Sequence, residues 1–278
     1  MTADPAAALP KLRLSHASGG TAEVYLHGAH VTSWVPAAGR EALFLSRAAT
    51  FAPGKAIRGG VPVIFPQFAG MGPLPKHGFA RTQPWERVDD ADRPDAVRLR
   101  LRDSEETRRI WPHAFVAELS VEVGDDWLSI TLAIHNTGSA AFEFTAALHT
   151  YLRVGDVRRA TVEGLRGLRY RVTGEQERVD EDRALSVNGA VDRVYLDTPA
   201  ELRVEDPENG REFLLRASGF ADTVVWNPWA EATAALPDME DDEYLEMLCV
   251  EAAQVGTPVR LEAGERWTGA QRIQITPG

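Results

Sequence analysis

Apolar and polar residues alternate along much of this chain, and the alternation restricts the folds that it can adopt. In Phe115–Val123 every second residue is apolar, and Val97–Arg102 and Trp127–Ile134 repeat the pattern. Successive side chains of a strand point to opposite faces, so each segment is expected to bury one face and wet the other, as antiparallel strands do. No stretch keeps the 3.6-residue period of an amphipathic helix over a normal helix length. The chain is therefore predicted to be all-β.

The alternation recurs, with turn residues between the runs, over roughly fifteen segments. Shorter strands are predicted at Ala22–Leu26, Glu201–Val204, Phe213–Leu215, Thr223–Trp226, Met247–Glu251, Val259–Leu261 and Arg272–Ile275. No break in composition and no repeat divides the chain, so residues 1–278 are predicted to form a single domain, a large antiparallel β-sandwich rather than a closed barrel. Residues 1–10 are expected to be a loosely ordered N-terminal segment. A short acidic helix is possible at 238–246, with its carboxylates on a solvated face.

The charge balance excludes several classes of partner. The formal net charge is −11, which argues against nucleic acid and against an anionic membrane surface. No apolar run is long enough to span a membrane, and Met1–Pro10 has neither the charge nor the apolar core of a signal peptide, so we expect a cytoplasmic protein. The single cysteine, Cys249, rules out an internal disulfide and a Cys-rich zinc site, and its apolar neighbours predict a buried thiol. The sequence leaves the oligomeric state open, with a monomer favoured.

Against this acidic background, one cationic segment stands out. Ile57–Pro66 and the nearby His77–Arg81 are rich in glycine and proline, which excludes a long helix, and they carry Arg58, Lys76 and Arg81. Guanidinium and backbone N–H groups in such a segment suit a small anionic ligand, and Gly59-Gly60 is expected to let the backbone approach that ligand closely. An alternative interpretation of Lys76 is that it lies next to this segment in solvent and binds no ligand.

Two ionisable residues interrupt apolar runs. His149 is predicted to lie inside an apolar strand, and Glu251 ends the run Met247–Val250. A lone histidine there is usually a satisfied core residue, and a glutamate is usually salt-bridged or at a strand end, but partial burial also suits an acid–base pair. Five other histidines are expected in turns or on polar strand faces: His16, His27, His30, His113 and His135. No spacing favours a metal site. Trp226–Trp229 could equally form the floor of a sugar pocket or fill the core where a strand passes into a turn.

Together, these segments resemble the glucose-6-phosphate 1-epimerases, a group within the aldose 1-epimerases. The resemblance covers nearly the whole chain, in the order that the family shows. It rests on Ile57–Pro62, on His77–Arg81 with Trp85, on Leu148–Tyr151, Asp192–Tyr195, Trp226–Trp229 and Cys249–Glu251. It implies a galactose mutarotase-like β-sandwich without a metal or organic cofactor, acting on a small-molecule sugar phosphate.

The resemblance also assigns roles to individual residues. His149 matches the general acid that protonates the ring oxygen, and Glu251 matches the base that takes the proton from the anomeric hydroxyl. His77 matches a residue that hydrogen-bonds the substrate near the reacting centre, and Asp192 matches a carboxylate that binds sugar hydroxyls. The arginines linked with the 6-phosphate correspond to Arg58 and Arg81. His149 would need to be protonated at neutral pH, and Asp192 is expected to favour that state.

Two alternatives stay open. One is an aldose 1-epimerase for unphosphorylated sugars, and the other is a carbohydrate-binding protein of the same fold without catalytic activity. The cations of the 58–81 segment favour a phosphorylated substrate, because binding a neutral sugar would not require a cluster of positive charges in an acidic protein. The presence of both His149 and Glu251 favours an enzyme, because a binding protein needs no acid–base pair.

Overall fold

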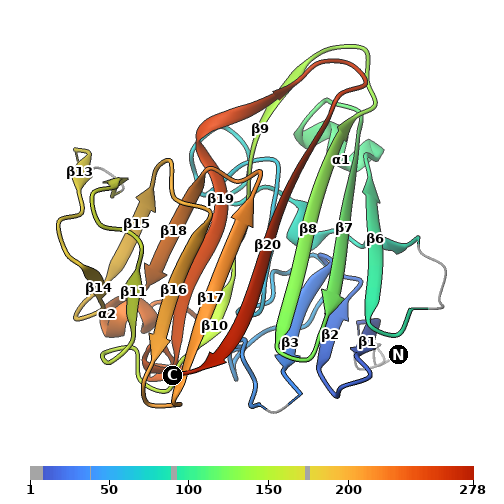
Figure 1. Cartoon of the computed structure of the whole chain (residues 1–278). Helices are drawn as coiled ribbons and strands as arrows, with labels where there is room; N and C mark the ends of the chain where they lie inside the picture. The colour runs from blue at the N-terminus through green and yellow to red at the C-terminus, as the bar shows by residue number, and fades with distance from the viewer. Residues whose placement is uncertain (1–8, 38, 89–92, 173–175) are drawn as a thin grey trace.

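The computed structural model describes residues 9–37, 39–88, 93–172 and 176–278. Most of the N-terminal segment expected to be loosely ordered, residues 1–8, lies outside these ranges. The described residues form three antiparallel sheets (Figure 1). None of their helices is both long enough and apolar enough to cross a membrane.

The two large sheets make up the sandwich predicted from the alternation. The eight-stranded sheet contains β13 (Arg178–Val179), β12 (Arg169–Arg171), β15 (Val191–Tyr195), β18 (Asp222–Asn227), β19 (Met247–Leu261), β9 (Phe142–Leu148) and β4 (Val63–Ile64) in this order, with β10 (Tyr151–Arg153) also paired with β19. The nine-stranded sheet has the order β14 (Ala184–Ser186), β11 (Thr161–Glu163), β16 (Glu201–Asp206), β17 (Arg211–Ser218), β20 (Arg266–Pro277), β8 (Trp127–Asn136), β7 (Phe115–Val123), β6 (Ala96–Arg102) and β5 (Glu86–Arg87).

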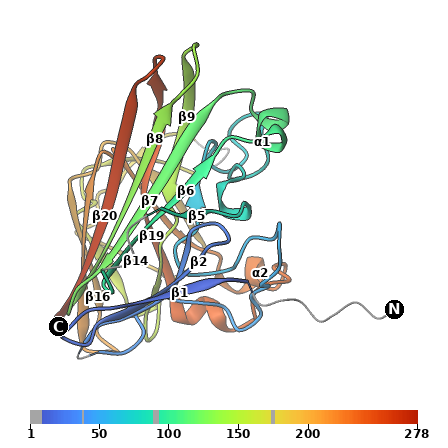
Figure 2. The ribbon, with the colours of Figure 1, turned by 90° about the vertical axis from the view of Figure 1, so that its right-hand side faces the viewer.

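Smaller elements complete the fold. A three-stranded sheet is formed by β1 (Lys11–Ser15), β2 (Thr21–Tyr25) and β3 (His30–Val35). The helices are short: η1 (Ala80–Thr82), α1 (Glu105–Ile110), α2 (Trp229–Thr233) and η2 (Glu243–Glu246). Figure 2 shows β6, β7, β8 and β20 as one slanted layer, with α1 and α2 to its right. The acidic helix expected at 238–246 is reduced to the single turn η2.

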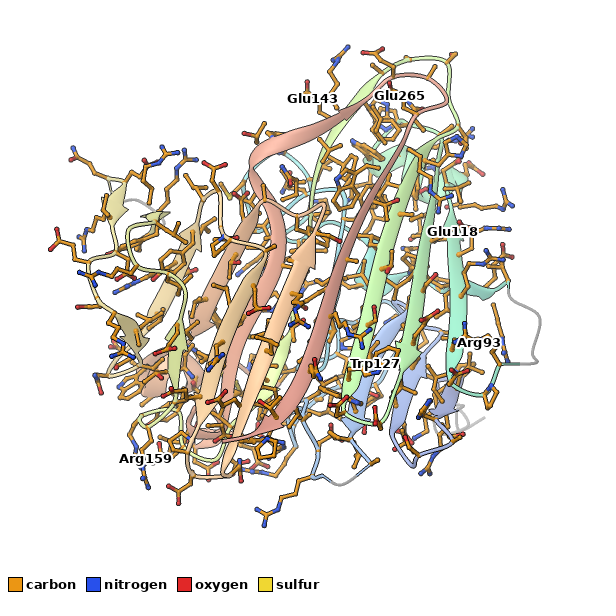
Figure 3. The ribbon with its side chains drawn as sticks, viewed as in Figure 1. Arg93, Glu118, Trp127, Glu143, Arg159 and Glu265 are labelled. Atoms are coloured by element: carbon orange, nitrogen blue, oxygen red, sulfur yellow. The ribbon has the colours of Figure 1, made fainter. Side chains whose placement is uncertain are left out.

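The core lies between the large sheets, where the alternation predicted it. In β7, Phe115, Leu119 and Val121 are fully buried, and residues of the facing sheet such as Leu148 and Val225 belong to the same cluster. On the outer face of the nine-stranded sheet, polar side chains form cross-strand ion pairs instead. Arg100 donates to Glu118 at 2.7 Å across β6 and β7. Figure 3 shows where Glu118 lies on this sheet. The nine-stranded sheet therefore has one dry and one wet face, which is the arrangement that a period of two encodes. In the eight-stranded sheet, most of β18 and the first half of β19 are buried on both faces.

Two strand predictions were wrong in detail. Met247–Glu251 and Val259–Leu261 are parts of one strand, β19, whose pairing with β9 shifts between Gln254 and Val259. A bulge there absorbs the turn-forming residues without ending the strand. His149 does not lie inside a strand: it follows the last residue of β9, and β10 begins at Tyr151. The described residues also contain twenty strands, more than the roughly fifteen predicted.

Candidate active site

A pocket of about 420 Å³ opens on the face of the eight-stranded sheet that points away from the sandwich core. This volume falls in the usual range for small-molecule sites. The sequence-predicted residues that line it are Arg58, Lys76, His77, His149, Asp192, Trp226 and Glu251. Arg81 is the one candidate outside that lining.

The register of the sheet explains how distant residues meet in this pocket. Leu148 pairs with Ala252 and Tyr151 pairs with Cys249, so His149 lies opposite Glu251. Residues directly opposite in an antiparallel sheet share a face. The catalytic candidates are therefore neighbours although about a hundred residues separate them in the chain.

The same row continues across three more strands. Glu251 pairs with Val224, Val224 pairs with Val194, and Val194 pairs with Arg171. All of these residues line the pocket. We call the series from His149 to Arg171 the pocket row. It makes a floor with ionisable groups at both ends and two valines between them.

His149 and Glu251 form a buried pair. Nε2 of His149 lies 3.3 Å from Oε1 of Glu251, and the side chains are 10% and 1% exposed. Burial raises the pKa of Glu251 well above its ordinary value and lowers the pKa of His149 well below its own. Both shifts disfavour charge, because removing ionised groups from water is costly. Burial thus favours the uncharged form of each group, and Oε2 of Glu251 is buried without a protein partner.

The expected effect of Asp192 on His149 was wrong. The charges that act on His149 after burial are those of His77, Arg81 and Arg58, and all of them lower its pKa. Asp192 acts instead on Glu251, where its negative charge adds to the effect of burial and raises the pKa further. Burial and the nearby Asp192 carboxylate therefore favour the protonated form of Glu251.

His77 is held as a hydrogen-bond donor toward the pocket. The backbone N–H of Ala69 donates to Nδ1 of His77 at 3.2 Å, which makes that nitrogen an acceptor. Burial, followed by the charges of Arg81 and Lys76, lowers the pKa of His77 to about 3. The ring is therefore neutral, with its hydrogen on Nε2. Its centroid lies 5.6 Å from that of His149.

The loop that carries Arg58 is fixed by two histidines that are not turn residues. His30 is the first residue of β3 and fully buried, and its Nε2 donates to the carbonyl of Gly59 at 2.7 Å. His27, also buried, bonds to the carbonyl of Lys55 at 2.7 Å. Their role is structural, as the sequence predicted for them.

Gly59 and Gly60 are needed for the packing of this loop and do not line the pocket. We had expected them to let the backbone approach a ligand. A Cβ on Gly60, whose φ is +62°, would lie 2.1 Å from the carbonyl oxygen of Val31. A Cβ on Gly59 would lie 2.4 Å from that of Phe44. Glycine is needed because the loop packs directly onto neighbouring backbone.

Arg58 is clamped from two sides. Its Nε and Nη2 donate to Oδ1 of Asp238 at 3.2 and 3.1 Å, and its Nη1 donates to the hydroxyl of Tyr151 at 3.0 Å. Burial opposes the charge of Arg58, but Tyr151 and Asp238 outweigh it and raise the pKa above the ordinary arginine value. Arg81 lies farther back, donating from Nη2 to the carbonyl of Lys76 at 3.1 Å, and its Nε is buried without a partner.

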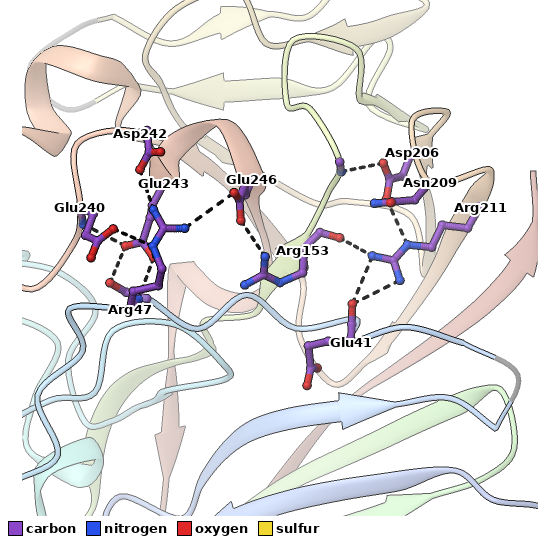
Figure 4. A network of polar contacts seen from close by, with 12 residues as sticks. Glu41, Arg47, Arg153, Asp206, Asn209, Arg211, Glu240, Asp242, Glu243 and Glu246 are labelled. Atoms are coloured by element: carbon purple, nitrogen blue, oxygen red, sulfur yellow. Dashed lines mark hydrogen bonds and ion pairs between the residues drawn. The ribbon is translucent and has the colours of Figure 1, made fainter.

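The acidic segment 238–246 is only in part the solvated face that the sequence suggested, since Glu240, Asp241 and Asp242 are exposed. Glu243 is fully buried and accepts from the Ser46 hydroxyl at 2.6 Å and from the Arg47 and Glu240 backbone N–H groups at 2.7 and 2.9 Å. The Arg47 guanidinium also contacts Glu240 and Asp242 at 2.6 Å (Figure 4). These contacts dock the segment against the N-terminal half of the chain and bring Asp238 to Arg58.

The motif Trp226–Trp229, which begins in the last two residues of β18, combines the two roles proposed for it. Trp226 lines the pocket. Trp229 packs against Tyr244 with ring centroids 5.2 Å apart. Asn227 is structural, since its side-chain nitrogen donates to the carbonyls of Tyr244 and Met247 at 2.8 Å. Cys249 is buried, as predicted, and burial raises the pKa of its thiol.

Sequence reasoning missed three residues of this site. Arg171 lines the pocket, but Arg169–Arg171 reads as an ordinary polar strand. Asp238 lies in an acidic run that resembles solvent-exposed chain. Tyr151 was part of a recognised motif, without a role of its own. In the described ranges, no three His, Cys, Asp or Glu side chains lie together so that they could hold a metal ion.

Comparison with known proteins identifies the class to which this site and fold belong. A crystal structure of a "putative mutarotase" from Salmonella typhimurium superposes with a TM-score of 0.89 at 32% identity, covering 99% of this chain and 92% of that one. A galactose mutarotase-like protein from Lactobacillus casei shares the fold, with a TM-score of 0.75 at 16% identity over 96% of this chain and all of that one. The fold is therefore galactose mutarotase-like.

Sequence comparison is more specific. The family model described as aldose 1-epimerase matches residues 10–274, and the chain belongs to this family of isomerases. One relative, from Cenchrus ciliaris, is 40% identical over 97% of this chain and 85% of its own length. Another, from Escherichia coli, is 38% identical over 90% of this chain and 85% of its own. Both are named "Putative glucose-6-phosphate 1-epimerase".

Proposed function

We propose that this protein interconverts the α and β anomers of a hexose 6-phosphate, with D-glucose 6-phosphate as its substrate. The observation that carries the proposal is the buried His149–Glu251 contact of 3.3 Å at the floor of a pocket whose wall holds Arg58 and Lys76. The names of the relatives from Cenchrus ciliaris and Escherichia coli point to the same substrate.

The reaction needs one proton removed from the anomeric hydroxyl and one delivered to the ring oxygen as the bond between that oxygen and C1 breaks. In the proposal, the pair reacts with its proton transferred from Glu251 to Nε2 of His149, 3.3 Å away. The unpartnered Oε2 of the ionised Glu251 accepts the hydroxyl proton, and Nε2 of the imidazolium donates to the ring oxygen. One proton shared by the pair is sufficient, because the reverse transfers return it in each turnover. Rotation about the C1–C2 bond and the reverse transfers give the other anomer. Each proton transfer is expected to contribute about 10²–10⁴-fold.

The position of the cations agrees with a phosphate on O6. The ring oxygen and C6 are both attached to C5, so the phosphate must lie on the side of the group that protonates the ring oxygen. Arg58 lies on that side of the pocket, since it is bonded to Tyr151, which stacks on His149. Lys76 and Arg81 add positive charge near His77. We propose that His77 donates to the substrate near the reacting centre and that Asp192 accepts from a sugar hydroxyl.

Anomer exchange followed by NMR, with glucose 6-phosphate and glucose side by side, tests the proposal. Faster exchange of the phosphorylated sugar supports it. Faster exchange of free glucose would favour an aldose 1-epimerase for neutral sugars, and no acceleration of either would leave a binding protein. His149→Ala and Glu251→Gln should each abolish most of the turnover, with folding checked by circular dichroism.

A further inference from the structure

Tyr151 contacts both the candidate phosphate ligand and the candidate acid. It is the first residue of β10 and 3% exposed. Its hydroxyl accepts from Nη1 of Arg58 at 3.0 Å. Its ring is stacked on the imidazole of His149, with centroids 4.8 Å apart and planes inclined by 11°. One side chain therefore contacts both the residue proposed to bind the phosphate and the residue proposed to protonate the ring oxygen.

The surroundings hold this side chain in place. Trp226 meets the Tyr151 ring edge-on at 6.0 Å, and backbone pairing with Cys249 fixes its position in the sheet. On its far side, Arg58 is held by Asp238. A guanidinium bonded at two edges keeps one orientation, and its remaining N–H groups are preorganised for an anion.

We propose that Tyr151 is a positioning residue that holds the guanidinium of Arg58 and the imidazole of His149 in fixed relation to each other. This inference rests on the proposed function. Its hydroxyl acts on Arg58, and therefore on the binding of the phosphorylated sugar. Its ring acts on His149, and therefore on proton transfer to either a phosphorylated or a free sugar.

Two variants separate these actions. Tyr151→Phe removes the hydroxyl and keeps the ring, so the KM for glucose 6-phosphate should rise about 10-fold with little change in kcat, as for the loss of one hydrogen bond to a charged group. The weaker exchange of free glucose should stay unchanged. Tyr151→Leu also removes the stack, and the kcat for both sugars should fall at least about 10-fold, because misplaced catalytic groups lose rate steeply.

Tyr195→Phe is the matched control. Tyr195 is also buried, and its hydroxyl also accepts from an arginine, Arg193, at 3.1 Å, but that arginine does not line the pocket, and the ring of Tyr195 packs against Tyr170 instead of a pocket histidine. This variant should leave the kinetics of both sugars unchanged. Melting temperatures of all three variants identify any general loss of folding.

The outcomes are distinct. Equal losses on both sugars in Tyr151→Phe, or kinetics like those of Tyr195→Phe, would overturn the inference while leaving the proposed function intact. If the wild type does not accelerate the exchange of glucose 6-phosphate, the proposed function fails. Calorimetric titration with glucose 6-phosphate then decides: weaker binding in Tyr151→Phe than in wild type supports the link to Arg58, and equal binding refutes it.

Discussion

Replacement of Glu251 by glutamine should destroy activity and stabilise the fold, increasingly so as the pH rises. Burial raises the pKa of Glu251 above its ordinary value of 4.5, so the folded protein keeps a proton that the unfolded chain has lost. Stability contributed by a raised carboxyl pKa is present at low pH and is lost as the pH rises from 4.5 toward the folded-state pKa. Glutamine carries no titrating proton and avoids this loss.

The magnitude follows from the linkage slope. In that window, each pH unit removes about 1.4 kcal/mol of stability from the wild type but not from Glu251→Gln. For 278 residues, the unfolding entropy is about 0.6 kcal/mol/K. The gap between the two melting temperatures should therefore widen by about 2 °C per pH unit. His149 titrates in both proteins, so the difference between them isolates Glu251.

Thermal unfolding followed by circular dichroism, from about pH 5 to about pH 8, measures this gap. Glu231→Gln, at an exposed site, gives the baseline for losing one surface carboxylate. A gap that stays constant across the range would show that Glu251 ionises as an ordinary glutamate, and the account of the buried pair given above would then be wrong.

Three further substitutions test other parts of the structure. Arg58→Ala should raise the KM for glucose 6-phosphate about 10- to 100-fold with little effect on kcat; a large fall in kcat at unchanged KM would contradict a binding role. Glu243→Ala leaves three buried or half-buried donors without a partner, so unfolding should become easier by about 3–5 kcal/mol, or about 5–9 °C in Tm; a shift below about 1 °C would refute this. Gly60→Ala should cost about 3 kcal/mol or more, because its Cβ would clash with the Val31 carbonyl; near-normal stability in denaturant titration would show that the loop can relax.

The strands were the most predictable part of the molecule, since a period of two is a local property. Phe115–Val123 has the predicted ends, and its apolar residues face the core. Where tertiary pairing overrides local signals, prediction failed. Gly256 and Pro258 look like a turn, yet pairing with β9 carries β19 through them with a bulge.

The site was predictable only in part, for a related reason. His149 and Glu251 were detected because ionisable residues in apolar runs are anomalous in sequence. Arg58 and Asp238 are 180 residues apart, and nothing local distinguishes Asp238 from its acidic neighbours. The roles of Arg58, Arg81 and the other site residues stay predictions until the variants are measured.

The pocket row has an evolutionary consequence. The proposed acid–base pair lies at the end formed by β9 and β19, while Val194 and Arg171 lie at the end formed by β15 and β12. These ends are three strand spacings apart, about 14 Å between Glu251 and Arg171. We therefore expect mutations at the far end to alter which sugars fit without disturbing the proposed proton-transfer groups. A sheet laid out in this way lets selection vary the substrate while the chemistry is inherited unchanged.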